Sequence, residues 1–164
     1  MDVKKTFLNG VIEEEVYIEQ PLGFETHDKK THVCRLKKAL YGLKQAPKTW
    51  YKRIDGFLMD LGFRKSKAYS NLYYKVEDER IMILLLYVDD LFLRGKEKLI
   101  SEFKKNLATK FEMKGLGMMH YFLGFEVWKF QDEIFLNQGK YAIEILKRIR
   151  MMDCKVMTTL MTTN

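Results

Sequence analysis

The feature that most constrains the fold is an apolar run that ends in two adjacent carboxylates. Residues 81–88 contain no charged side chain and lead directly into Asp89 and Asp90, after which residues 91–93 resume the apolar pattern. A continuous apolar run of this length predicts a strand that is buried on both faces. We therefore predict a tight hairpin that carries Asp89 and Asp90 at its tip, on a rigid and buried base.

Two carboxylates at the tip of such a hairpin indicate a metal site. Carboxylates are costly there unless a cation neutralises them, and Mg2+ or Mn2+ is the natural partner of oxygen ligands. Two metal ions about 3.5–4 Å apart can clamp the oxygens of a phosphoryl transfer, and they need carboxylates from at least two segments. Asp2 is the best third candidate. For an isolated Asp-Asp pair, the alternative is a solvated turn.

Composition excludes several classes of protein. The 164 residues are enough for one domain with a core, and 29 basic against 22 acidic residues give a net charge of +7. This charge suits a polyanionic partner such as nucleic acid, although many soluble proteins are equally basic. Cys34, Cys154 and three scattered histidines form no zinc pattern. The longest apolar run is far shorter than the roughly 20 residues of a membrane helix, so we expect no membrane partner.

Hydrophobic periodicity predicts an α+β fold, in which strands alternate with amphipathic helices. Pro47 lies in the predicted first turn of one helix, and Gly62 ends it. Two hairpins are expected, each followed by a further helix. The predicted strands are residues 2–8, 16–18, 33–36, 72–76, 81–88, 91–93, 121–128 and 133–136, and the predicted helices are 47–61, 97–110 and 139–151.

Several segments of the chain resemble one family. Tyr87-Val88-Asp89-Asp90 resembles the catalytic box of reverse transcriptases. Residues 2–10, 33–47 and 121–127 are similar to longer boxes of the copia-type branch of LTR retrotransposons: the first catalytic aspartate, the nucleotide pocket and the primer-grip hairpin. Residues 19–24 also fit. Because the boxes follow the family order over nearly the whole chain, the sequence is identified as similar to the reverse transcriptase of a retrotransposon Pol polyprotein.

The resemblance implies an RNA-directed DNA polymerase that adds dNTPs to a primer 3′ end on an RNA or DNA template. It implies a ferredoxin-like βαββαβ palm, followed by the primer-grip hairpin and a partial thumb over residues 1–154. Residues 155–164 are rich in Thr and Met, and we expect them to form a flexible tail. Asp2 and Asp89 would ligate two Mg2+ ions, for which Mn2+ could substitute, and Asp90 would support the site beside the primer 3′-hydroxyl.

The resemblance also implies residues that bind the nucleotide and the primer. Phe7 would be a steric gate against a ribose 2′-OH, and Gly42 would let the backbone approach the nucleotide. Lys44 and Gln45 would line the base and template side, and Tyr87 would also bind the nucleotide. Leu123 and Gly124 would lie near the primer terminus.

Each of these roles has a structural alternative. Phe7 could be core, Gly42 an ordinary turn glycine and Lys44 a solvated surface lysine, while Tyr87 packs in its strand in either case. The basic residues of 35–53 could form a solvated helix face or follow a phosphate backbone. The aromatic residues among them, Tyr41, Trp50 and Tyr51, are more often core than base-stacking platforms.

Because Asp2 follows the first residue, we expect the family's fingers to lie outside this chain, together with the RNase H segment of the parent polyprotein. These segments would be partners of the chain, which alone would be weakly active or inactive. The alternatives are a catalytically dead relic that at most binds nucleic acid non-specifically, or an unstable fragment without a function. The expected location is a cytoplasmic virus-like particle or the nucleus.

Overall fold

The computed structural model describes residues 1–26, 32–131 and 133–155. The chain forms two compact units, Met1–Leu116 and Gly117–Asn164. Apart from Lys155, the predicted flexible tail lies outside the described residues. Within the described part of the chain, no helix is long and apolar enough to cross a membrane.

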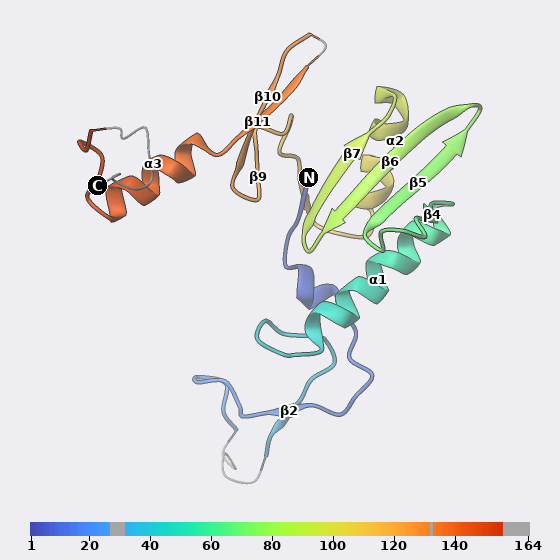
Figure 1. Cartoon of the computed structure of the whole chain (residues 1–164). Coiled ribbons are helices and arrows are strands. Elements are labelled where there is room, and N and C mark those ends of the chain that lie inside the picture. Colours follow the sequence, from blue (N-terminus) through green and yellow to red (C-terminus); the bar gives the residue numbers. More distant parts are fainter. Residues whose placement is uncertain (27–31, 132, 156–164) are drawn as a thin grey trace. The chain divides into compact units, whose positions relative to one another are not determined.

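A six-stranded antiparallel sheet organises the first unit (Figure 1). Its strands are β1 (Asp2–Val3), β4 (Arg64–Lys65), β5 (Leu72–Glu77), β6 (Arg80–Tyr87), β7 (Asp90–Arg94) and β8 (Met113–Lys114). Their order in the sheet is β4-β5-β6-β7-β1-β8, so the first strand of the chain lies between β7 and β8. The long β5–β6 hairpin forms as predicted.

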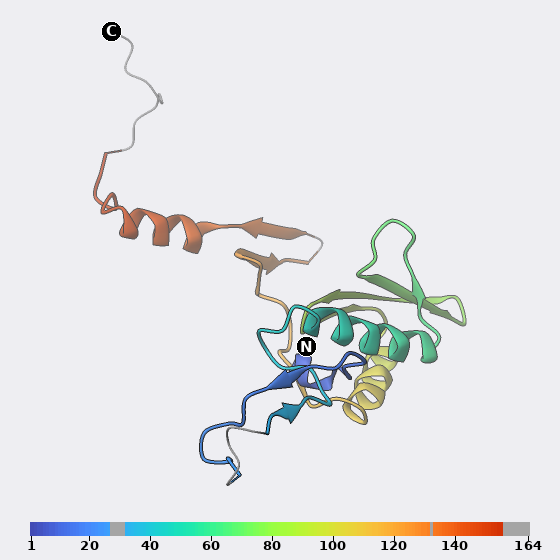
Figure 2. The same ribbon diagram turned by 90° about the horizontal axis from the view of Figure 1, so that it is seen from below.

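Two helices, α1 (Ala46–Asp60) and α2 (Glu97–Ala108), cover one face of this sheet (Figures 1 and 2). Pro47 lies in the first turn of α1, as predicted, because its missing N–H costs little there. The α1 side chains Trp50, Ile54 and Leu58 pack with the buried side chains of the sheet and of α2 in one apolar cluster. Helices combined with antiparallel sheets confirm the α+β class.

The prediction that the apolar strand is buried on both faces is wrong. Along β6, Met82, Leu84 and Leu86 are buried beneath the helices, whereas Ile81 and Ile83 are 57% and 39% exposed. The strand therefore alternates, as expected for an antiparallel sheet with one covered face. Periodicity could not show this, because the side chains of both faces are apolar.

The segment between β1 and α1 forms a smaller lobe. The predicted strand of residues 2–8 ends at Val3, and a 3-10 helix, η1 (Thr6–Asn9), follows it. The lobe also contains β2 (Tyr17–Ile18) paired with β3 (Cys34–Arg35). Its Ile12 and Ala39 form a small apolar cluster with Ala46 of α1.

The second unit contains a three-stranded antiparallel sheet and one helix. Its elements are β9 (Tyr121–Phe122), β10 (Phe125–Lys129), β11 (Ile134–Asn137) and α3 (Gly139–Arg148). The single strand predicted over residues 121–128 is wrong, because Leu123 and Gly124 form a turn with φ values of 48° and 85°. Two successive residues with positive φ are typical of a type I′ hairpin turn.

Candidate active site

Four side chains of the predicted site region lie in one row across the sheet. Tyr87 on β6 pairs with Asp90 on β7, Asp90 pairs with Asp2 on β1, and Asp2 pairs with Lys114 on β8. Paired residues point to the same face of a sheet. Because Leu91 and Val3, the next residues of their strands, are buried in the core, Asp90 and Asp2 project from the face opposite the helices.

The hydrogen bonds around Asp2 and Asp90 bring their side chains close together. The Val3 N–H donates to the Asp89 carbonyl at 2.9 Å, and the Leu91 N–H donates to the Met1 carbonyl at 2.8 Å. These bonds flank the Asp2–Asp90 pair, which is therefore a non-hydrogen-bonded pair with Cβ atoms about 4.5–5.5 Å apart. Residues that are 88 positions apart in the chain thus carry neighbouring carboxylates.

Asp89 lies in the two-residue turn that connects β6 and β7. Val88, the other residue of this turn, has a φ of 54°, a region that β-branched side chains rarely adopt. Its carbonyl accepts a hydrogen bond of 2.7 Å from the Nε1–H of Trp50 on α1. The predicted hairpin forms, but of the two carboxylates predicted at its tip only Asp89 lies in the turn, because Asp90 is the first residue of β7. The turn is held from the helix side of the sheet.

The electrostatics of the row disfavour a charged Asp90. Burial raises the pKa of the Asp90 carboxyl, and the charges of Asp89 and Asp2 raise it further. The terminal ammonium of Met1 opposes this shift in the pKa of Asp90, and it donates a hydrogen bond of 2.9 Å to the Leu91 carbonyl. A cation bound beside Asp90 would favour the charged form of this carboxyl.

Asp2 and Asp90 of this row and Asp89 in the adjacent turn are together called the carboxylate row below. Their oxygens suit a hard divalent ion, because carboxylate oxygens are the preferred ligands of Mg2+ and Mn2+. Among the described residues, however, no three carboxylate, imidazole or thiol side chains already form a group able to hold a metal ion. The structure therefore places the predicted ligands Asp2, Asp89 and Asp90 at neighbouring positions, but their side chains do not yet form a complete metal-binding group.

Phe7 lies on η1, close to the end of β1. It is half-buried and packs against both apolar clusters, and its ring meets that of Tyr41 edge-on, with 4.9 Å between the centroids. Tyr41 is 61% exposed, so the expectation of a core residue is wrong for Tyr41, whereas Trp50 is core as expected. The contact brings the loop before α1 to the segment that follows Asp2.

The other predicted nucleotide-binding residues lie in that loop. Gly42 has a φ of 91°, which favours glycine, and within the described part of the chain no atom lies within 4 Å of where a Cβ would be. The Lys44 side chain is exposed. The carbonyl of Gln45 accepts the Thr49 N–H in the first turn of α1. Leu123 and Gly124 form the β9–β10 turn of the second unit.

Sequence reasoning missed two residues of this region. Lys114 was not singled out because a two-residue strand has no periodicity that could reveal it. The sequence predicts Trp50 as a core residue, but spacing along α1 cannot predict its hydrogen bond to the Val88 carbonyl.

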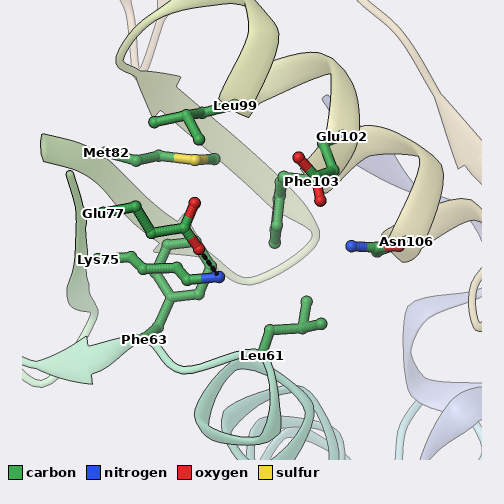
Figure 3. Close-up of a pocket in the computed structure, with 9 residues that line it drawn as sticks. All are labelled: Leu61, Phe63, Lys75, Glu77, Met82, Leu99, Glu102, Phe103 and Asn106. Atoms are coloured by element: carbon green, nitrogen blue, oxygen red, sulfur yellow. Dashed lines mark ion pairs between the residues drawn. The ribbon is translucent and has the colours of Figure 1, made fainter. Parts of the chain in front are cut away.

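The structure also contains a pocket among α1, β5, β6 and α2 (Figure 3). It lies beside Met82 near the start of β6, whereas the carboxylates follow the end of this strand. Lys75 and Glu77 form an ion pair at the pocket. Since no residue of the carboxylate row lines it, the pocket is separate from the candidate site.

Comparisons with known proteins define the class of protein. Residues 1–163 match the family model described as "Reverse transcriptase (RNA-dependent DNA polymerase)". The chain is 42% identical over 97% of its length to the Retrovirus-related Pol polyprotein from transposon TNT 1-94 of Nicotiana tabacum. It is 37% identical over 97% of its length to the corresponding polyprotein from transposon RE1 of Arabidopsis thaliana. No solved structure matches.

The chain therefore belongs to the reverse transcriptase family, in its copia-type branch, as the four sequence boxes predicted. It spans 12% of the length of the tobacco polyprotein and 11% of the Arabidopsis one.

Proposed function

We propose that this chain carries the palm active site of an RNA-directed DNA polymerase, which adds dNTPs to the 3′ end of a primer on an RNA or DNA template. The observation that carries the proposal is the row in which Asp90 and Asp2 occupy a non-hydrogen-bonded pair beside Asp89. Polymerisation is a phosphoryl transfer, which depends mainly on positioning and charge stabilisation.

Asp2 and Asp89 are the proposed ligands of two Mg2+ ions, and Asp90 supports the site beside the primer terminus. When bound, divalent ions would hold the triphosphate oxygens and neutralise the charge that develops on them. The chain's own contribution is to hold the three carboxylates on adjacent strands. The raised pKa of Asp90 supports this assignment, since carboxylates that repel one another have an affinity for cations.

The nucleotide would lie beside the row, against η1 and the loop before α1. Phe7 is the proposed gate against a ribose 2′-OH, and its ring contact with Tyr41 would fix it in place. Gly42 leaves open space where its Cβ would be, so that a nucleotide could approach the backbone. Lys44 and Gln45 would contact the base and template, Tyr87 would flank the nucleotide, and Leu123 and Gly124 would contact the primer.

We further propose that the first unit corresponds to a ferredoxin-like palm, and that residues 1–154 comprise the palm and the beginning of the thumb. Template, primer, dNTPs and the fingers and RNase H segments of a parent polyprotein are the proposed partners. A cytoplasmic particle or the nucleus is the proposed location.

Primer extension on poly(rA)–oligo(dT) tests this function. Because the family's fingers are expected to lie outside this chain, we expect the purified chain to extend the primer only weakly with Mg2+ or Mn2+, and the Asp89→Asn variant to lose at least about a hundredfold of that rate because a ligand is removed. Lys75→Gln, at the separate pocket, is the matched control and should retain activity. Equal rates for the parent and Asp89→Asn would contradict the catalytic role.

A second candidate function is nucleic-acid binding without chemistry. It is favoured by the net charge of +7, which suits a polyanionic partner. In that case the parent and Asp89→Asn would bind a primer–template equally well, with the same dependence on salt, and neither would extend it.

A further inference from the structure

The turn that carries Asp89 is held by a side chain from the opposite side of the sheet. Trp50, on α1, is 2% exposed and donates its Nε1–H to the Val88 carbonyl at 2.7 Å. A buried indole N–H requires an acceptor, and here the acceptor is the backbone of the turn itself.

The conformation of Val88 explains why this turn needs support. Its φ of 54° lies in the left-handed region, which is unfavourable for a β-branched residue and persists only when the surroundings impose it. Two-residue hairpin turns normally have glycine or asparagine at such a position. Without a contact such as the hydrogen bond from Trp50, Val88 would favour other backbone conformations. Because Asp89 and Asp90 follow Val88 directly, their side chains would then point in other directions.

The two successive carbonyls of the turn are both fixed, one by the helix layer and one by the sheet. Trp50 holds the carbonyl of Val88, while the N–H of Val3 on β1 holds the carbonyl of Asp89 at 2.9 Å. The second bond also aligns β1, the strand that carries Asp2.

The indole is itself held in a rigid setting. Its ring meets that of Phe111 edge-on, with 5.4 Å between the centroids, and Phe111 meets Phe57 in the same manner at 5.3 Å. Phe57 lies two turns further along α1, and Phe111 directly precedes Glu112, whose carbonyl accepts the Lys4 N–H beside β1. The donor is therefore anchored to the same elements that position Asp2.

We propose that Trp50 is a positioning residue of the active site: through the Val88 carbonyl it orients the carboxylates of Asp89 and Asp90 toward Asp2, and it thereby sets the affinity of the site for a divalent cation. This inference rests on the proposed function of the carboxylate row. It assigns to a core residue an effect on metal binding that burial alone would not predict.

The test compares Trp50→Phe, which keeps a buried ring but removes the N–H, with the parent chain. Trp128→Phe is the matched control, because Trp128 is 54% exposed and lies in the second unit. Mn2+ affinity is measured by electron paramagnetic resonance. We expect Trp50→Phe to bind Mn2+ about three- to tenfold more weakly, the effect of one lost hydrogen bond, and the control to bind as the parent does.

Asp89→Asn separates failure of this inference from failure of the proposed site. If Asp89→Asn binds Mn2+ as tightly as the parent, the carboxylate row is not the metal site, and the positioning role of Trp50 is then wrong as well. If Asp89→Asn weakens binding but a folded Trp50→Phe does not, the row is the metal site and the positioning role is wrong.

A second measurement leaves Trp50 in place and does not depend on the stability of its variant. In 15N-labelled Trp128→Phe, the single indole signal belongs to Trp50. We expect slow exchange of this N–H with solvent, and broadening of the signal when Mn2+ is added. Fast exchange would show that the hydrogen bond to Val88 is absent, and a signal unaffected by bound Mn2+ would show that the metal lies elsewhere; either result would overturn the proposal.

Discussion

The two units of this chain bury their apolar side chains to very different extents. The first unit has a continuous cluster, in which Ile54, Leu58, Leu84 and Leu107 are fully buried between the sheet and two helices. In the second unit α3 has no buried residue, and Val127 is the one buried apolar side chain among its described residues. Its exposed apolar residues include Trp128, Phe130, Ile134, Phe135, Leu136, Tyr141, Ile143 and Ile149.

This difference shows which parts of the candidate site have a rigid base. Asp2, Asp89 and Asp90 lie on strands and a turn that are held by long-range hydrogen bonds and by the core of the first unit. Leu123 and Gly124 lie on a hairpin that is held mainly by short-range contacts. Segments with few buried apolar contacts open at low free-energy cost. The geometry of the carboxylates should therefore be more robust than that of the hairpin.

The largest effect on the free energy of unfolding should appear when a buried leucine of the first unit and an exposed leucine of the second unit are each replaced by alanine. Leu84→Ala, at a fully buried position of β6, should lower the free energy of unfolding by about 2–5 kcal/mol, since it leaves a cavity. Leu136→Ala, at a position of β11 that is 62% exposed, should change it by less than about 0.5 kcal/mol. Urea denaturation measures both values, and equal costs would contradict the contrast between the units.

A smaller loss of stability should follow from disrupting a polar cluster at the edge of the first unit's core. The buried Tyr73 hydroxyl donates to Asp55 at 2.6 Å, and Lys65 pairs with the same carboxylate oxygen at 2.8 Å. Asp55→Ala should cost about 1–3 kcal/mol, because the Tyr73 hydroxyl loses its closer, charged acceptor and retains the more distant Tyr51 hydroxyl at 3.2 Å.

This cost should also depend on pH. Burial on its own raises the pKa of Asp55, but the hydrogen bonds from Lys65 and Tyr73, with the charge of Lys65, outweigh it and hold the pKa below the ordinary 3.8. A lowered folded-state pKa means that the stabilisation is present above pH 3.8 and is lost as the pH falls through the folded-state value. Denaturation of parent and Asp55→Asn between pH 2 and 6 checks this; a difference that grows toward low pH would refute it.

A substitution in the β9–β10 turn of the second unit should lower the stability of that hairpin without affecting the first unit. Gly124→Ala forces a Cβ onto a residue with a φ of 85° and should cost about 1 kcal/mol. Gly115→Ala is the control, because Gly115 has no positive φ and open space around its Cβ position. Hydrogen exchange should show faster opening of β9 and β10 and unchanged protection in β6. Loss of protection in β6 would mean that the units are not independent in stability.

The smallest effect should be a gain in stability. Because burial and the charges of Asp89 and Asp2 raise the pKa of Asp90, its ionised form is disfavoured in the folded chain. Without metal at pH 7, Asp90→Asn should therefore stabilise the protein, by less than about 1 kcal/mol because the site is partly solvated. This gain should vanish as the pH falls below the ordinary value of 3.8, where the parent carboxyl is protonated in both states. A lower melting temperature for Asp90→Asn in EDTA would contradict this.

Local patterns in the sequence predicted most of the first unit. The apolar run of residues 81–88, Pro47 and Gly62 placed β6 and α1 correctly, because each is a short-range feature. The boxes around Asp2 and Asp89 predicted the family. These features depend on neighbouring residues or on whole motifs, and a single sequence is enough to recognise either of them.

The features that the sequence did not predict depend on contacts between distant segments. The open face of β6 is apolar, so its exposure at Ile81 and Ile83 could not be read from hydrophobicity. The position of Lys114 beside Asp2 follows from the register of β1 with β8, which no local pattern encodes. The hydrogen bond from Trp50 to Val88 joins residues 38 positions apart.

The central claim is that the pairing of β1 with β7 places the carboxylates of Asp2, Asp89 and Asp90 in one cation site. Mn2+ titrated into the 15N-labelled chain tests it directly, since a bound paramagnetic ion broadens the amide signals around it. The account predicts that residues 2–3, 89–91 and 113–114 broaden first, and that this broadening is lost in Asp89→Asn. Broadening that begins instead at the acidic run of residues 13–15, or that persists in Asp89→Asn, would contradict the account.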